Sequence, residues 1–109
     1  MITCIIRYDI EPFRQAEFAT YARMWGQAIP ACGADLIGYF GPHEGSLTTG
    51  YGLYTLDSLA AYEDYRARLK ASPAGQEAFE YARQQGFIRR EDRMFLTQLS
   101  APHATRVRR

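Results

Sequence analysis

Apolar and β-branched residues dominate the segment 2–10 (ITCIIRYDI), which is therefore predicted to form a β-strand. Its two alternating sets of side chains, Ile2/Cys4/Ile6/Tyr8 and Thr3/Ile5/Arg7, are both largely apolar. A strand that is apolar on both sides is typically covered on both sides. We therefore expect this segment at the centre of a sheet.

Between Phe13 and Ile29 the apolar residues recur at helical spacing instead. Pro12 presets the backbone of a first helical turn, and Pro30 and Gly33 are expected to end the helix. The apolar arc holds Phe13, Tyr21, Met24, Trp25 and Ala28, with Phe18 and Ile29 at one edge. One acidic residue, Glu17, falls inside this arc.

The rest of the chain predicts two strands, two helices and a last strand. The strands cover 34–41 and 46–56, with Gly50 and Gly52 leaving room on one face for close packing or a ligand. Asp57 or Ser58 caps a helix that runs to about Ala71. Ser72-Pro73 opens a shorter helix that ends at Gly86, before a strand over 88–98.

The predicted order is βαββαβ with one additional helical turn, which is the α+β, ferredoxin-like arrangement. Two helices would cover one face of a four-stranded antiparallel sheet. The 46–56 strand carries apolar side chains on both faces, so the face without helices needs another cover. We expect a homodimer in which a second copy covers it.

Composition supports one folded domain over 1–99, followed by a basic tail over 100–109. The chain has 109 residues, of which 47% are hydrophobic and 23% charged, which excludes intrinsic disorder. No apolar run reaches the roughly 20 residues that a membrane-spanning helix needs. Aromatic residues make up 14%, and eight of them are Tyr.

Charge and cysteine content narrow the partners and the compartment. Residues 1–99 carry 10 Lys and Arg against 12 Asp and Glu, so this part is slightly acidic and unsuited to nucleic acid. The tail, with Arg106, Arg108 and Arg109, is either a solvated end or a weak contact for anionic surfaces. The amino-terminal segment has no signal-peptide pattern, so a cytoplasmic protein is expected. Cys4 and Cys32 fit buried, reduced thiols, with a disulfide or a reactive thiol as the alternative.

Several segments resemble the NIPSNAP family, and together the likeness covers about residues 2–99. They are 54–69 (YTLDSLAAYEDYRARL), 71–73, 86–96 (GFIRREDRMFL) and 35–41 (DLIGYFG), with Tyr21 at the place of a helical Tyr. The resemblance implies a dimeric α+β barrel with pockets between sheet and helices. Tyr54 and Leu56 depart from the Trp and the aromatic residue common there, which puts the pocket shape in doubt. The family has no settled activity.

Three polar residues are candidates for chemistry. Glu17, as an acid on an apolar face, would be paired or protonated and could transfer a proton, unless it lies at the rim of the helix. Arg66, at the edge of the apolar side of its helix, could clamp a carboxylate, pair with Glu17 or lie on the surface. His43, beside Glu44 in a turn, could act as a base or be solvated. His103, in the tail, is uninformative.

Tyr8, Tyr21, Trp25 and Tyr54 could line an aromatic pocket, or could pack in the core and interface. In the last strand Arg89, Glu91 and Arg93 alternate with Arg90 and Asp92, which fits an edge that discourages wrong pairing or an anion site. No metal-ligand spacing, phosphate loop, nucleophile elbow or dinucleotide motif is present, so no metal or cofactor is expected.

Three functions remain open at this point. The first is a cytoplasmic homodimer that binds a small hydrophobic or aromatic molecule between sheet and helices. The second is a cofactor-independent enzyme like the monooxygenases on the same barrel, with Glu17 or His43 as base. The third is a scaffolding dimer with a filled core. Fold analogy alone does not decide among them.

Overall fold

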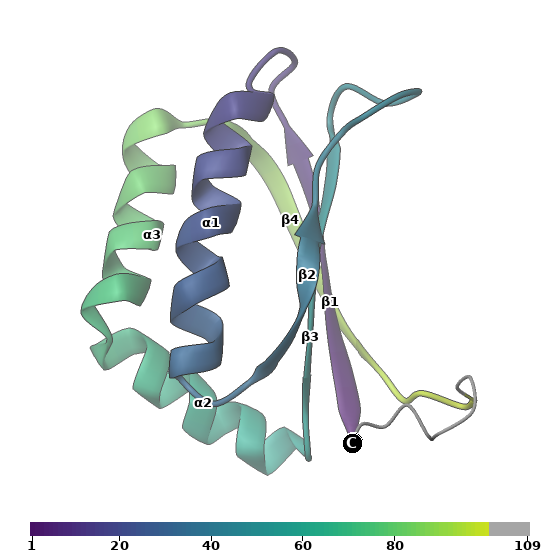
Figure 1. The fold of residues 1–109 in the computed structure, drawn as a ribbon, viewed down its shortest axis with the longest axis vertical. Helices are drawn as coiled ribbons and strands as arrows, with labels where there is room; N and C mark the ends of the chain where they lie inside the picture. Colours follow the sequence, from purple (N-terminus) through teal and green to yellow (C-terminus); the bar gives the residue numbers. More distant parts are fainter. Residues whose placement is uncertain (101–109) are drawn as a thin grey trace.

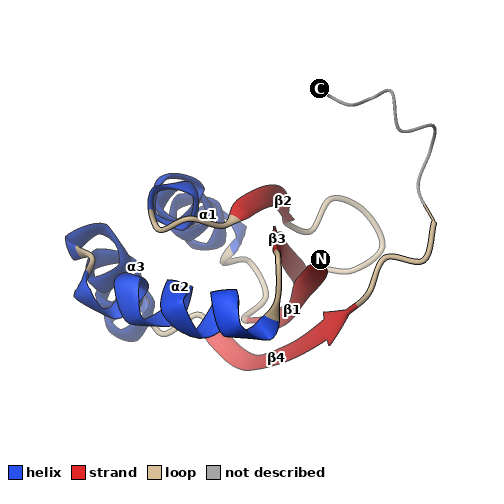
Figure 2. Ribbon diagram, turned by 90° about the horizontal axis from the view of Figure 1, so that it is seen from below, coloured by secondary structure: helices blue, strands red, loops and turns tan. Residues whose placement is uncertain are grey.

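The computed structural model describes residues 1–100, which form four strands and three helices in the expected ferredoxin-like order (Figure 1). The strands are β1 (Ile2–Ile10), β2 (Asp35–Phe40), β3 (Thr49–Leu56) and β4 (Ile88–Leu96). The helices are α1 (Gln15–Ala31), α2 (Leu59–Ala71) and α3 (Pro73–Gln85). All three helices lie on one side of the sheet, and the sheet is open (Figure 2).

The sheet is antiparallel throughout, with the order β2-β3-β1-β4. This places β1 in the interior, as its two apolar faces predict. β2 and β4 are the edge strands of the sheet. The pairing of β2 with β3 shifts register between Leu36 and Gly38, and the pairing of β1 with β4 shifts register between Asp9 and Ile10. In the β1–β3 ladder Cys4 pairs with Tyr54 and Ile6 with Gly52.

The start of α1 differs from the expectation. Phe13 has a φ of 67°, which a residue inside a right-handed helix cannot adopt, and its side chain is 80% exposed. The helix therefore begins at Gln15, and Arg14 precedes it without a side-chain cap. At the other end Pro30 lies within the last turn, and the helix ends at Ala31.

Two serines fix the ends of the other helices. The Ser58 hydroxyl accepts from the amide of Ala61 at 3.1 Å and caps α2. The Ser72 hydroxyl accepts from the amide of Gly75 at 3.2 Å and caps α3, which ends at the left-handed Gly86. With 13 residues, α3 is as long as α2 and not shorter as expected. The sequence correctly predicted that this helix begins after Ser72 and ends at Gly86, and these two ends give it 13 residues.

The core lies between the helices and the sheet face formed by the even-numbered residues of β1 and β3. Gly50 and Gly52 on this face provide the close packing that the sequence suggested. A Cβ at Gly50 would lie 2.7 Å from ring atoms of Phe18, and a Cβ at Gly52 would lie 2.6 Å from Cζ of Tyr39. The largest fully buried side chains are Tyr8, Tyr65, Phe18, Phe87, Ile10 and Ile29.

On the opposite face of the sheet, apolar side chains are open to solvent in the single chain, as predicted from the 46–56 segment. The same face carries the charged Arg7, Asp9, Arg90 and Asp92 toward one end of β1 and β4. Phe40 is 53% exposed and Tyr51 37%, and these two residues are partners in the β2–β3 ladder. Met94 and Leu96 on β4 are also exposed. Among residues 1–100, no helix is long and apolar enough to cross a membrane. His103, Arg106, Arg108 and Arg109 lie outside the described residues.

Candidate functional site

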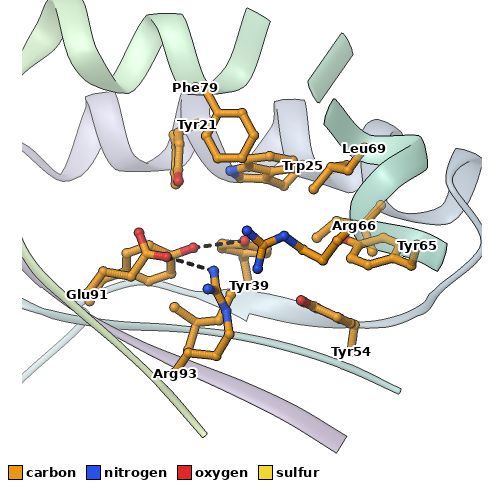
Figure 3. A pocket seen from close by; sticks show the side chains of 13 residues that line it. Tyr21, Trp25, Tyr39, Tyr54, Tyr65, Arg66, Leu69, Phe79, Glu91 and Arg93 are labelled. Atoms are coloured by element: carbon orange, nitrogen blue, oxygen red, sulfur yellow. Dashed lines mark hydrogen bonds and ion pairs between the residues drawn. The ribbon is translucent and has the colours of Figure 1, made fainter. Parts of the chain in front are cut away.

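A cavity of about 190 Å³ lies between the helices and the buried face of the sheet (Figure 3). All seven strands and helices contribute to its lining. Five lining residues are those predicted to bind a ligand: Tyr8, Tyr21, Trp25, Tyr54 and Arg66. The others are Ile6, Ile29, Tyr39, Tyr65, Leu69, Phe79, Glu91 and Arg93. The structure thus brings together one predicted set of residues from four elements.

Aromatic rings form most of the cavity wall and hold each other in edge-to-face contacts. Trp25 packs between Tyr21, at a ring-centroid distance of 5.9 Å, and Phe79, at 5.0 Å. The hydroxyls of Tyr8 and Tyr39 form a hydrogen bond of 3.0 Å. Such contacts fix the ring orientations, so the wall is built before any ligand enters.

The phenols of the cavity are neutral over the physiological range. Burial raises the pKa of Tyr8, Tyr21, Tyr39, Tyr54 and Tyr65 above the ordinary value of 10.0, because the charged phenolate loses its hydration. These groups can donate or accept hydrogen bonds. They are not poised to serve as bases near neutral pH.

Three charged side chains reach the cavity. Glu91 and Arg93 lie on β4 opposite Tyr8 and Ile6 of β1, so both point to the helix side of the sheet. They form an ion pair of 2.9 Å. Arg66 reaches the cavity from α2, donates to the Tyr62 hydroxyl at 2.7 Å and lies 5.6 Å from the centroid of that ring.

One buried donor has no partner. The indole Nε1 of Trp25 is shielded from solvent, and no acceptor within the described residues takes its proton. The residue is 4% exposed and lines the cavity. A buried N–H without an acceptor is unfavourable. Because this atom is itself shielded from solvent, it does not border the open volume that the rest of the Trp25 side chain lines.

Glu17 lies outside this cavity, at the rim of α1, which is the alternative to the buried acid that the sequence left open. Its carboxylate pairs with Arg14 at 3.2 Å, and its side chain is 31% exposed. A hydrogen bond from its own amide and the Arg14 guanidinium lower the pKa of Glu17, so the group is ionised and not a stored proton. The predicted pairing with Arg66 is absent for the same reason.

His43 also lies outside the cavity. It is exposed, in the loop between β2 and β3, and borders a separate shallow hollow with Gln15, Phe18 and Tyr39. Neither residue predicted to act as a base therefore faces the aromatic lining.

Sequence reasoning missed Tyr39, Tyr65, Glu91 and Arg93 as lining residues. For Glu91 and Arg93 a signal existed, because the alternating charges of the last strand suggested an anion site as one alternative. For Tyr39 the register shift in β2 hides the side-chain direction, since one extra residue reverses the faces. Tyr65 was assigned to the apolar side of its helix without a place in a pocket.

The cysteines are free and buried, as predicted. Burial raises the pKa of the Cys4 thiol, so it is held as the unreactive protonated form. In residues 1–100 no group of three or more His, Cys, Asp or Glu is arranged to hold a metal ion.

Comparison with known proteins decides the family. The profile of the NIPSNAP family matches residues 3–102. The chain belongs to the NIPSNAP family. Among curated proteins, none is significantly similar to this NIPSNAP protein.

Solved structures agree with this assignment. An uncharacterised NIPSNAP-like domain protein from Burkholderia xenovorans shares 32% identity, covering 93% of this chain and 89% of that one, with a TM-score of 0.73. A NIPSNAP family protein of unknown function from Agrobacterium tumefaciens has 20% identity, coverages of 88% and 86%, and a TM-score of 0.75. A proposed antibiotic biosynthesis monooxygenase from Nitrosomonas europaea has 13% identity, coverages of 92% and 100%, and a TM-score of 0.70. This last likeness concerns the fold alone.

Proposed function

We propose that this NIPSNAP protein is a homodimer that binds one small aromatic molecule in the cavity between sheet and helices. The observation that carries the proposal is the preformed cavity with aromatic walls. Its volume of about 190 Å³ suits a single ring with a small substituent, since a cavity of about 150 Å³ accommodates benzene. The free buried thiols agree with a reducing compartment, so we expect the protein in the cytoplasm.

The cavity favours binding over the two alternatives. A scaffolding dimer would have its core filled by Tyr21, Trp25 and Tyr54, whereas these side chains border open volume. A cofactor-independent enzyme would need a base beside the substrate, and both Glu17 and His43 lie elsewhere. The one carboxylate in the lining, that of Glu91, is held in an ion pair with Arg93. The described residues therefore support recognition of a ligand more strongly than its conversion.

Trp25 provides the test, because it is the chain's single Trp and lines the cavity. Purified protein is titrated with a set of neutral and acidic one-ring compounds (phenol, indole, benzamide, benzoate and phenylacetate) while Trp25 fluorescence is recorded. We expect saturable changes for at least one compound. Native mass spectrometry of the same protein should detect one ligand per chain, including any molecule retained during purification.

A pair of variants on α2 separates cavity binding from surface binding. Leu69→Phe adds volume to a side chain that lines the cavity, and should abolish the fluorescence response. Leu59→Phe makes the same chemical change at a position that is 56% exposed and outside the cavity, and should leave the response intact. Equal responses in both variants, or no response in the parent protein to any compound, would refute the proposed binding.

The homodimer rests on the uncovered face of the sheet. Its apolar side chains come from all four strands, with Phe40 on β2, Tyr51 on β3, Ile5 on β1 and Met94 on β4. A contiguous apolar surface of this kind indicates a protein partner. A second copy presents a matching sheet face, so one symmetric contact would cover both. Light scattering of the purified protein should give twice the chain mass of 12.4 kDa.

A further inference from the structure

The charged side chains around the cavity do not balance. Two guanidinium groups, those of Arg66 and Arg93, and one carboxylate, that of Glu91, line it. Glu91 Oε2 is already bound by Arg93 Nη2 at 2.9 Å. Within residues 1–100 no carboxylate forms an ion pair with Arg66. Arg66, which is an exposed residue, therefore places at the cavity one positive charge that no carboxylate of residues 1–100 pairs.

Arg66 retains donors for a further partner. Its hydrogen bond to Tyr62 uses Nη1, and a guanidinium has five N–H donors in one plane. In Figure 3 its guanidinium extends into the middle of the cavity, toward Arg93 and the Tyr39 side. Tyr62 supports the other side of the group through its ring. Two parallel N–H bonds to a carboxylate are the preferred interaction of such a fork.

Nearby charges argue for an anion at this position. Two guanidinium groups that extend into one small cavity repel each other, and Glu91 neutralises only its own partner. The phenols beside them cannot compensate, because burial raises the pKa of Tyr39 and Tyr65 and keeps them neutral. A single negative charge on the ligand would balance the lining.

The aromatic walls are a second and independent indication, because Tyr21, Trp25 and Phe79 form an edge-to-face set of rings along the cavity. The cavity therefore offers guanidinium donors from α2 together with aromatic walls. An acceptor-rich, planar molecule suits this combination.

We infer that the ligand of this cavity is an aromatic monocarboxylate whose carboxylate is bound by Arg66. This inference rests on the proposed binding function and specifies the class of ligand. The ring packs among the tyrosines and Trp25, and the negative charge offsets the excess positive charge of the lining. A second negative charge would face Glu91 without a free cation, so a monoanion fits better than a dianion.

The experiment compares acids with their neutral amides, which have nearly the same shape. Benzoate and phenylacetate are titrated against benzamide and phenylacetamide by Trp25 fluorescence and by calorimetry at pH 7. Since a hydrogen bond to a charged group adds more than a neutral one, we expect the acids to bind about ten- to hundredfold more tightly. The acid preference should decrease as salt is added.

Variants of α2 assign this preference to one residue. Arg66→Met should remove the preference for acids while binding of the amides remains. Arg66→Lys, which keeps the charge but not the fork, should retain part of it. Lys70→Met removes one positive charge from the same helix outside the cavity and should leave the preference unchanged.

Each result is decisive. Acids preferred by the parent and by Lys70→Met, but not by Arg66→Met, support the inference. Amides that bind as tightly as acids, or a preference that survives Arg66→Met, overturn the inference and leave the binding function standing. If neither acids nor amides bind, the inference and the proposed function both fail.

Discussion

The ring of Tyr39 lies directly over Gly52, so that a Cβ at position 52 would lie 2.6 Å from its Cζ atom. This close approach lets the Tyr39 hydroxyl reach that of Tyr8, and the two form a hydrogen bond of 3.0 Å at the cavity wall. The absence of a side chain on β3 thus sets the position of a ring from β2. Gly52 belongs to the site although it does not line it.

Gly52→Ala should therefore destabilise the protein and disturb the cavity. A methyl group at this position displaces Tyr39, and overpacking of this kind costs about 1–3 kcal/mol. The free energy of unfolding in urea measures the effect. As a control, Gly26→Ala should stabilise α1 by about 0.5–1 kcal/mol, because nothing lies within 4 Å of its added Cβ. Equal effects of the two changes would contradict this account of Gly52.

Tyr51→Asp should convert the proposed dimer into a monomer. Tyr51 is 37% exposed in the single chain and lies in the apolar face of the sheet, where a carboxylate would lose its hydration on association. Light scattering gives the mass directly. Leu59→Asp introduces the same charge on the outside of α2 and should leave the dimer unchanged. A Tyr51→Asp protein that remains dimeric would place the interface elsewhere.

Ser58→Ala should lower stability by about 0.5–2 kcal/mol, the usual cost of losing an N-cap. Its hydroxyl accepts from the amide of Ala61, at the end of α2 that follows β3. Because α2 carries Arg66 and Leu69, weakening of its first turn should also lower affinity for the cavity ligand. Thermal unfolding and fluorescence titration measure the two effects. Ser46→Ala, in the loop before β3, is the control and should affect affinity little.

Stability should fall as the pH rises beyond about 10. The pKa values of Tyr8, Tyr21, Tyr39, Tyr54 and Tyr65 are raised by burial above 10.0, the ordinary value that the unfolded chain retains. Below pH 10 the phenols are protonated in both states and contribute no pH dependence. Above it the unfolded chain loses protons first, which favours unfolding. Circular dichroism follows unfolding, and tyrosinate absorbance follows the ionisation of these five phenols, which should occur together with unfolding. Ionisation of the five phenols near pH 10 while the circular dichroism is still that of the folded protein would contradict their burial.

Much of this fold could be predicted from local patterns. The two apolar faces of residues 2–10 placed β1 in the interior of the sheet, and Ser72-Pro73 and Gly86 marked both ends of α3. Five lining residues of the cavity (Tyr8, Tyr21, Trp25, Tyr54 and Arg66) were predicted from the same patterns. Such patterns suffice where a residue's environment is set by its own strand or helix.

The errors arose where the environment depends on a neighbouring element or on helix phase. The buried stripe of α1 is centred on Phe18, Tyr21 and Trp25, whereas the sequence placed Phe18 at its edge. This rotation moves Glu17 to the rim, beside Arg14. Phe13 has a positive φ, and the helix begins only at Gln15, so Phe13 is not part of the buried stripe. Counting Phe13 in the predicted apolar arc had placed Glu17 inside that arc.

The contacts of Arg66 could not be predicted either, because they depend on how α2 lies over the sheet. The sequence left three alternatives for this residue, and the structure places its guanidinium at the cavity.

Both outer strands of the sheet are poorly suited to recruit another strand. The first half of β4 is charged at every position from 89 to 93, with Arg90 paired to Asp92, and the β2 ladder is interrupted between Leu36 and Gly38. Uninterrupted, uncharged borders would allow backbone pairing to continue from chain to chain. With these borders, an unpaired copy of the protein can meet another through the flat side of its sheet without being drawn into fibrils.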